Sequence, residues 1–153
     1  MKDGAPPDGW NQGGSTVEKY QSLYDRAMSE RIPGDISNDL DWLYQFWSHF
    51  LVRNFNHDMY NDFRSLAIED GTAGDDKGLS HLSQYYGAVL SGSQVLSAKL
   101  ADDITKIAGA EYDTKRHIFQ RLRSAWRNGA FNFKSRKLID KSLSAELRAE
   151  LEK

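Results

Sequence analysis

The residues best suited to chemistry lie in a basic segment toward the C-terminal end of the 153-residue sequence. Residues 115–145 carry nine Lys or Arg side chains and one acid, whereas residues 1–114 carry nine cations and 18 acids. Cations neutralise phosphates, and the rings of Trp126, Phe131 and Phe133 lie among them, where they could stack on unpaired bases. The segment predicts a surface for a nucleic acid or another polyanion. A solvated helix face with Trp126 in the core is the alternative.

Within the basic segment, this prediction assigns some side chains to the phosphates of RNA and others to stacking on its bases. The predicted phosphate contacts are Arg116, Arg123, Arg127, Lys134, Arg136 and Lys137, and Phe131 or Phe133 offers the stacking face.

A second group of polar residues has helical spacing. Gln45, His49 and Arg53 step by four, and Gln84 repeats the position of Gln45 in a later segment. Placed side by side, these residues would line one surface with hydrogen-bonding groups. The alternative is that they are ordinary polar positions between apolar stripes.

The composition argues against several other functions. The sequence has no cysteine, which excludes disulfides, thiolate zinc sites and a cysteine nucleophile. Its four histidines form no metal-binding motif, and no catalytic constellation is apparent. No apolar run is long enough to span a bilayer. We therefore expect a cytoplasmic protein that is not an enzyme and that needs no metal, no cofactor and no membrane.

Apolar residues recur at three- and four-residue steps along most of the chain, and no segment shows sustained period-two alternation. This pattern predicts an all-α protein. Residues 1–14, rich in Gly and Pro, are expected to form a flexible tail, and Ser15 to Glu18 resemble a capping box. Residues 70–78 are expected to form a loop, and residues 130–141 are expected to be irregular.

An internal repeat organises these helices. Residues 43–47 (Leu-Tyr-Gln-Phe-Trp) recur as residues 82–86 (Leu-Ser-Gln-Tyr-Tyr), 39 positions later, and a fainter copy begins 40 positions further on. Helix pairs with a period of about 40 residues are typical of HEAT-like stacking. The sequence predicts about three helical hairpins, forming a short right-handed α-solenoid in a single domain over residues 15–153.

Three segments, residues 43–51, 55–70 and 78–86, resemble the C-terminal HEAT-like region of the La-related protein 1 family, also called the DM-fifteen region. The resemblance covers about residues 18–110. It implies a module that binds the 7-methylguanosine cap and first nucleotides of messenger RNAs beginning with a terminal oligopyrimidine tract, and so restrains their translation.

Four positions depart from the pattern of that family. Gln45 and Gln84 fall where the family has Arg, Ala88 falls where a Tyr stacks on the cap, and Ser91 falls where an acid reads the methylated guanine. Ala and Ser supply neither stacking nor charge. The family's second stacking Tyr lies in the third repeat, where Phe131 or Phe133 could stand in. The resemblance thus implies an inherited fold with cap recognition lost or rebuilt.

The sequence therefore predicts a monomeric RNA-binding module of a La-related regulator of translation or mRNA stability. It would bind the 5′ end or single-stranded segments of mRNA through its basic face. The alternative is a HEAT-like scaffold that binds protein partners and no RNA.

Overall fold

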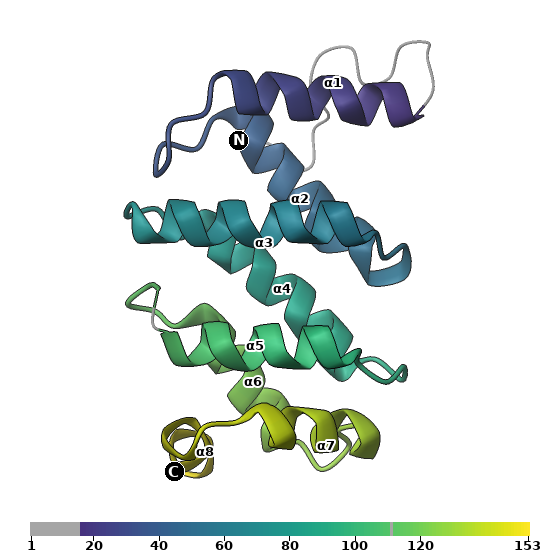
Figure 1. The fold of residues 1–153 in the computed structure, drawn as a ribbon, viewed down its shortest axis with the longest axis vertical. Coiled ribbons are helices and arrows are strands. Elements are labelled where there is room, and N and C mark those ends of the chain that lie inside the picture. The colour runs from purple at the N-terminus through teal and green to yellow at the C-terminus, as the bar shows by residue number, and fades with distance from the viewer. Residues whose placement is uncertain (1–15, 111) are drawn as a thin grey trace. The chain divides into compact units, whose positions relative to one another are not determined.

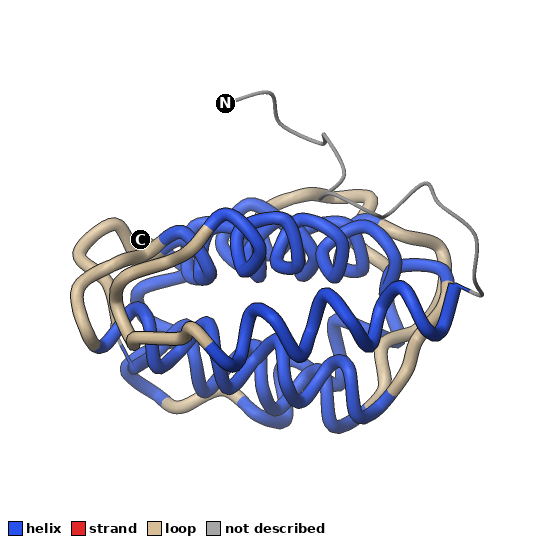
Figure 2. Tube along the Cα trace, turned by 90° about the horizontal axis from the view of Figure 1, so that it is seen from above, coloured by secondary structure: helices blue, strands red, loops and turns tan. Residues whose placement is uncertain are grey.

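The computed structural model describes residues 16–110 and 112–153, and these residues form helices joined by loops, with no β-strand (Figures 1 and 2). The predicted tail and Ser15 of the capping box lie outside the described residues. The all-α class is confirmed. In the described ranges the helices are α1 Thr16–Ser29, α2 Asn38–Arg53, α3 His57–Thr72, α4 Lys77–Ser91, α5 Ala98–Ala110, α6 His117–Trp126, α7 Phe133–Ser142 and α8 Ala145–Glu152.

Polar side chains cap several of these helices. Ser37 accepts a hydrogen bond from the Leu40 amide at the start of α2, and Asn56 accepts one from the Met59 amide at the start of α3. Ser144 caps α8 in the same way. Each cap satisfies an amide that has no partner within its helix. No described helix is both long and apolar enough to cross a membrane.

The chain groups into two compact units, Met1–His81 (unit 1) and Leu82–Lys153 (unit 2), with the boundary inside α4. In unit 1, α2 packs against both α1 and α3. Leu23 from α1 and Tyr44 and Trp47 from α2 are fully buried with Phe63 from α3. The rings of Trp47 and Phe63 stack with their centroids 5.5 Å apart. The apolar residues of α2 that recur at four-residue steps, Leu43, Trp47 and Leu51, therefore belong to the core of unit 1.

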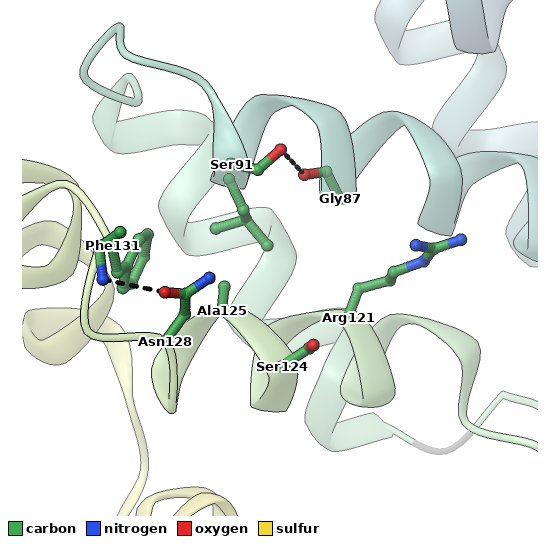
Figure 3. A pocket seen from close by; sticks show the side chains of 9 residues that line it. Gly87, Ser91, Arg121, Ser124, Ala125, Asn128 and Phe131 are labelled. Carbon is green, nitrogen blue, oxygen red and sulfur yellow. Dashed lines mark hydrogen bonds between the residues drawn. The ribbon is translucent and has the colours of Figure 1, made fainter.

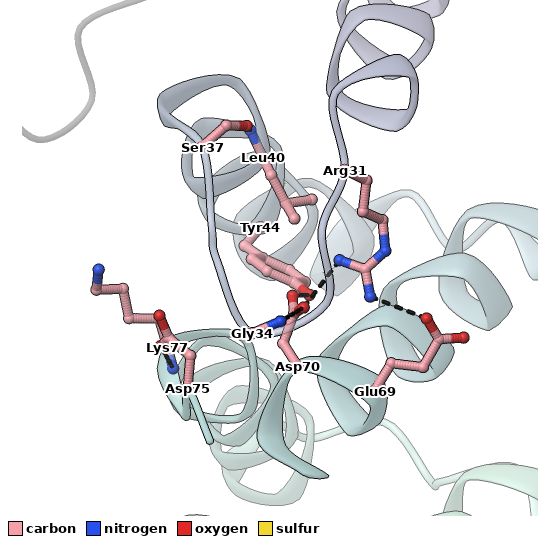
Figure 4. Close-up of polar contacts among 9 residues, drawn as sticks. All are labelled: Arg31, Gly34, Ser37, Leu40, Tyr44, Glu69, Asp70, Asp75 and Lys77. Carbon is pink, nitrogen blue, oxygen red and sulfur yellow. Dashed lines mark hydrogen bonds and ion pairs between the residues drawn. The ribbon is translucent and has the colours of Figure 1, made fainter. Parts of the chain in front are cut away.

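A buried carboxylate joins three parts of unit 1 (Figure 4). Asp70, in the last turn of α3, accepts hydrogen bonds from Arg31 Nη1 at 2.8 Å, from the Gly34 amide at 2.9 Å and from the Tyr44 hydroxyl. Gly34 has a φ of 85°, which favours glycine. Burial, together with the hydrogen bond to Asp70, raises the pKa of Tyr44. The expectation that residues 70–78 form a loop is correct only for residues 73–76, because α3 runs through Thr72 and α4 begins at Lys77. Partners distant in sequence hold Asp70 inside the helix.

In unit 2, α5 packs against α6, α7 and α8. Tyr85 and Tyr86 of α4 are both buried, and so is Trp126 at the end of α6, as its core alternative predicted. The loop before α5 is tied to the start of α7: Ser135 Oγ accepts from the Leu96 amide at 3.0 Å, and Asn132 Nδ2 donates to the Ser93 carbonyl at 3.1 Å.

The helix α7 replaces the irregular structure expected for residues 130–141. Asn132 caps it by accepting hydrogen bonds from the amides of Lys134 and Ser135. Only Ile139 among its apolar residues is fully buried, so the helix has little of the apolar periodicity that sequence analysis detects. Its position depends on contacts with α5.

Candidate nucleic-acid interface

Arg116, the first of the predicted phosphate contacts, is engaged inside unit 2. Its guanidinium group donates to both carboxylate oxygens of Glu150, at 2.7 and 3.2 Å, and to the Ala108 carbonyl at 3.1 Å. It also lies 4.0 Å from the centroid of the Phe119 ring. The hydrogen bond from Arg116 lowers the pKa of Glu150. Arg116 thus links α5, α6 and α8, and does so with a left-handed backbone, φ 51°.

Arg136 is also held by its own unit. It donates from Nη1 to the Trp126 carbonyl at 2.7 Å, and its guanidinium carbon lies 3.8 Å from the centroid of the Trp126 ring. A cation at the C-terminal end of α6 also offsets the partial negative charge of the helix dipole.

Arg123 and Arg127 of α6 contact the end of α8. Arg123 Nη2 donates to the Lys153 carbonyl at 3.1 Å, and Arg127 Nε donates to the Leu151 carbonyl at 3.2 Å. The last carbonyls of a helix have no partner within it, so each guanidinium satisfies one. Each also keeps further N–H donors, because an arginine has five.

A cavity of about 250 Å³ lies between α4 and α6 in unit 2 (Figure 3). Ser91 and Arg121 contribute side chains from the two helices, and Phe131 closes one end from the loop that precedes α7. Gly87 allows Arg121 to lie across α4: a Cβ at this glycine would stand 3.1 Å from Arg121 Cδ. The complete lining is Gly87, Leu90, Ser91, Arg121, Ser124, Ala125, Asn128, Ala130 and Phe131.

A second hollow, of about 330 Å³, adjoins this cavity and shares Ser124 and Asn128 with it. Arg123 and Arg127 line the second hollow together with Gln120. No carboxylate lines either space. Arg121 and Arg123 of α6 and Arg127 at its C-cap therefore line two adjoining spaces that no acidic side chain lines, an arrangement suited to an anionic ligand.

The remaining predicted contacts of unit 2 lie on α7 and α4. Phe133 is 69% exposed at the start of α7, and Lys137 Nζ lies 5.1 Å from its ring centroid. Lys134 is exposed beside them, and Gln84 is exposed on α4. Phe131 lines the cavity instead, so the two alternatives for a stacking ring occupy different sites.

The other predicted hydrogen-bonding residues belong to unit 1. His49 and Arg53 are exposed on α2, and Gln45 is half-buried there. The surface predicted to combine these three residues with Gln84 stays a prediction, because Gln84 belongs to unit 2.

Three polar residues of the cavity were not singled out by sequence analysis: Arg121, Ser124 and Asn128. Arg121, Ser124 and Ala125 are three and four residues apart on α6, so they share one face of that helix, and Asn128 follows shortly after its end. That spacing is the feature of the sequence that could have indicated a shared polar face on this helix. Arg121 could not be separated from the other cations, because its position depends on Gly87 of another helix.

Helices that pack in sequence order, with a repeat near 40 residues, define an all-α module of the HEAT type. The sequence model of the LARP1 HEAT repeat region matches residues 10–153, and the chain belongs to that family. The HEAT region of this family is a non-catalytic binding module associated with mRNA. The resemblance of residues 18–110 to the La-related protein 1 family is thereby confirmed, and the match extends beyond them.

Proposed function

We propose that unit 2 binds single-stranded RNA, in particular the 5′-end segment of an mRNA, along α6 and the start of α7. The observation that carries the proposal is the pair of adjoining spaces lined by Arg121, Arg123 and Arg127 without any carboxylate. Arginine pairs with phosphate through two parallel N–H donors, and the spaces are open to such pairing.

The aromatic residues support a single-stranded ligand. Phe131 lines the cavity and Phe133 is exposed next to Lys134 and Lys137. A ring beside cations provides a stacking surface for an unpaired base while the cations hold the backbone. Arg116 and Arg136 serve this surface indirectly, because their guanidinium groups hold α6 against α8 and α7.

The proposal is tested by titrating a fluorescent single-stranded RNA at several salt concentrations. Three phosphate contacts predict a slope of about −2 in log affinity against log salt, because each contact releases counterions with a coefficient of about 0.7. Affinity should fall by roughly 20-fold between 50 and 200 mM salt. An affinity that ignores salt, or no binding at low salt, would refute RNA binding by this surface.

A matched pair of variants localises the site. Arg121→Gln removes a cation that lines the cavity, and we expect weaker RNA binding with a salt slope reduced by about 0.7. Lys106→Gln removes one charge from α5, where Lys106 pairs with Asp102 at 2.9 Å and lines neither space. Equal RNA affinities for the two variants would show that the cavity is not the site.

A further inference from the structure

Ser124 of α6 lies among the arginines that line the two spaces of unit 2. Arg121 precedes it by three residues, Arg123 by one, and Arg127 follows it by three. Residues three apart on a helix are neighbours on its surface, so Arg121 and Arg127 flank the serine along the helix. Ser124 itself lines both the cavity and the second hollow.

The Ser124 hydroxyl is accessible from solvent. The residue is exposed, and Figure 3 shows its side chain at the cavity between those of Ala125 and Arg121. Ser124 also stands in the last turn of α6, which ends at Trp126. The end of a helix opens more readily than its middle, so an enzyme that needs an extended segment has to open only one turn here.

The residues before Ser124 suit a kinase that recognises basic substrates. The run Arg121-Leu122-Arg123 places one cation three residues before the hydroxyl and another directly before it. Kinases select substrates partly by their charge pattern, because an acidic groove on the enzyme attracts cations at fixed distances from the target hydroxyl.

We infer that Ser124 is a phosphorylation site and that its phosphate occupies the anion-binding spaces of unit 2, which excludes RNA from them. The inference rests on the proposed function, since it names a regulation of the same surface. In the reaction, Ser124 Oγ bonds to the γ-phosphorus of Mg-ATP, the bond from that phosphorus to the bridging oxygen breaks, and ADP leaves with the electron pair. The hydroxyl proton passes to the catalytic base of the kinase.

Groups already in place would hold this phosphate. Phosphoserine carries a charge of about −1.5 to −2 near neutral pH and has three acceptor oxygens. Arg123 and Arg127 each keep donors besides the one bonded to the end of α8, and no carboxylate lines either space. The dipole of α6 disfavours an anion in its last turn, and the three arginines around Ser124 offset this effect.

The phosphate would therefore compete with RNA for the same cations. A charge of about −2 neutralises two of the three predicted phosphate contacts, so the salt slope of RNA binding should fall from about −2 to about −0.7. RNA affinity at 0.1 M salt should fall by about tenfold or more.

The first test measures RNA binding by protein synthesised with phosphoserine at position 124 and by protein with phosphoserine at position 29. Ser29 is the control: it is exposed at the end of α1 and follows an arginine by three residues, but it belongs to unit 1 and lines neither space. We expect the loss of affinity at position 124 and a change of less than about twofold at position 29. Equal affinities would overturn the inference, and so would loss of helical circular dichroism in the protein modified at position 124.

The second test measures whether Ser124 is modified in the folded chain. The protein is incubated with Mg-ATP and a purified serine kinase that selects arginine three residues before its target, and phosphate is located by mass spectrometry. We expect phosphate on Ser124, with slower incorporation when saturating single-stranded RNA is bound. After the same treatment, Ser124→Ala should keep the RNA affinity that it had before.

An absence of phosphate on Ser124 would overturn the inference, as would incorporation that bound RNA does not slow. Neither result affects the proposed function, which requires only that the unmodified protein binds RNA at this surface. A protein that binds no RNA before modification would refute the proposed function and the inference together.

Discussion

Arg31 and Asp70 lie 39 positions apart in the chain, and Arg31 Nη1 is 2.8 Å from Asp70 Oδ1. The same separation recurs in unit 2, where Leu96 bonds to Ser135 and Asn132 bonds to Ser93. It equals the spacing of the sequence repeat between residues 43–47 and 82–86. The repeat therefore appears in hydrogen bonds between successive parts of each unit as well as in the apolar residues.

Replacing this buried carboxylate should strongly destabilise the protein. Asp70→Asn keeps the size of the side chain but removes the charge that pairs with Arg31, which is only 8% exposed, and places an amide donor among three donors. We expect a loss of about 3–5 kcal/mol in the free energy of unfolding, measured by urea denaturation.

The matched control is Glu69→Gln, because Glu69 binds the same guanidinium group from an exposed position. Glu69→Gln should lower the free energy of unfolding by at most about 1 kcal/mol. Similar costs for the two substitutions would show that burial does not set the strength of the Asp70 interactions.

Alkaline pH should unfold the protein through its buried tyrosines. Burial raises the pKa of Tyr20 and of Tyr85 from the ordinary tyrosine value of 10.0 to about 12, and burial with the hydrogen bond to Asp70 raises that of Tyr44. A folded-state pKa above the unfolded value means that the stability they contribute is complete below pH 10 and is lost as the pH rises toward about 12.

The measurement is a pH titration that follows tyrosinate absorbance and helical circular dichroism together. We expect late ionisation of some tyrosines to coincide with the loss of helix. Ionisation of all seven tyrosines near pH 10 in a protein that remains folded would contradict this prediction.

Gly87→Ala should separate RNA binding from stability. The new methyl group would stand 3.1 Å from Arg121 Cδ, and a flexible side chain can move away. We expect the displaced guanidinium group to weaken RNA binding by about threefold, which is about 0.7 kcal/mol. Alanine in a helix is favoured over glycine by about 0.5–1 kcal/mol, so the melting temperature should not fall.

Gly109→Ala is the control for this substitution, because its Cβ would meet only Leu147 Cδ2, at an ordinary 4.0 Å. RNA affinity should be unchanged in this variant. If both alanine variants bound RNA as tightly as the unmodified protein, the placement of Arg121 across Gly87 would have no bearing on binding.

Phe133 should contribute a stacking surface without contributing to the core. Its ring is 69% exposed, so Phe133→Ala is expected to leave the melting temperature unchanged. Loss of one base–aromatic stack costs about 1–3 kcal/mol, so RNA affinity should fall by about fivefold or more. Phe55→Ala, at an exposed phenylalanine of unit 1, should leave RNA affinity as it is. Equal affinities in the two variants would remove Phe133 from the interface.

The sequence predicts the helices of this protein well where apolar residues recur regularly, as they do on α2 through Leu43, Trp47 and Leu51. It fails at α7, where a single buried isoleucine leaves too little periodicity, and at Asp70, which looks like a loop residue among glycines and acids. In both cases distant residues decide the structure: Leu96 and Ser93 bind the start of α7, and Arg31 binds Asp70.

The candidate site was predicted less completely than the fold, because the charge of a side chain does not show where it points. Arg116 and Arg136 have the same charge as Arg121 and lie in the same basic segment, yet they are bound to Glu150 and to the Trp126 carbonyl. Arg121 was not singled out among the cations. Whether an arginine of this segment is bound within the protein or lines the cavity depends on how α4, α7 and α8 pack around α6.

In the proposed RNA interface, the hydrogen bonds from Arg123 and Arg127 to the end of α8 would give that short helix an indirect part in binding. The carbonyls of Leu151 and Lys153 each accept a hydrogen bond from one guanidinium group, which restricts the conformational freedom of the Arg127 and Arg123 side chains. An RNA strand that binds Arg123 and Arg127 would therefore cause a smaller loss of side-chain entropy than it would at two unrestrained arginines. On the proposed function, loosening the contacts of α8 with Arg123 and Arg127 would therefore lower RNA affinity.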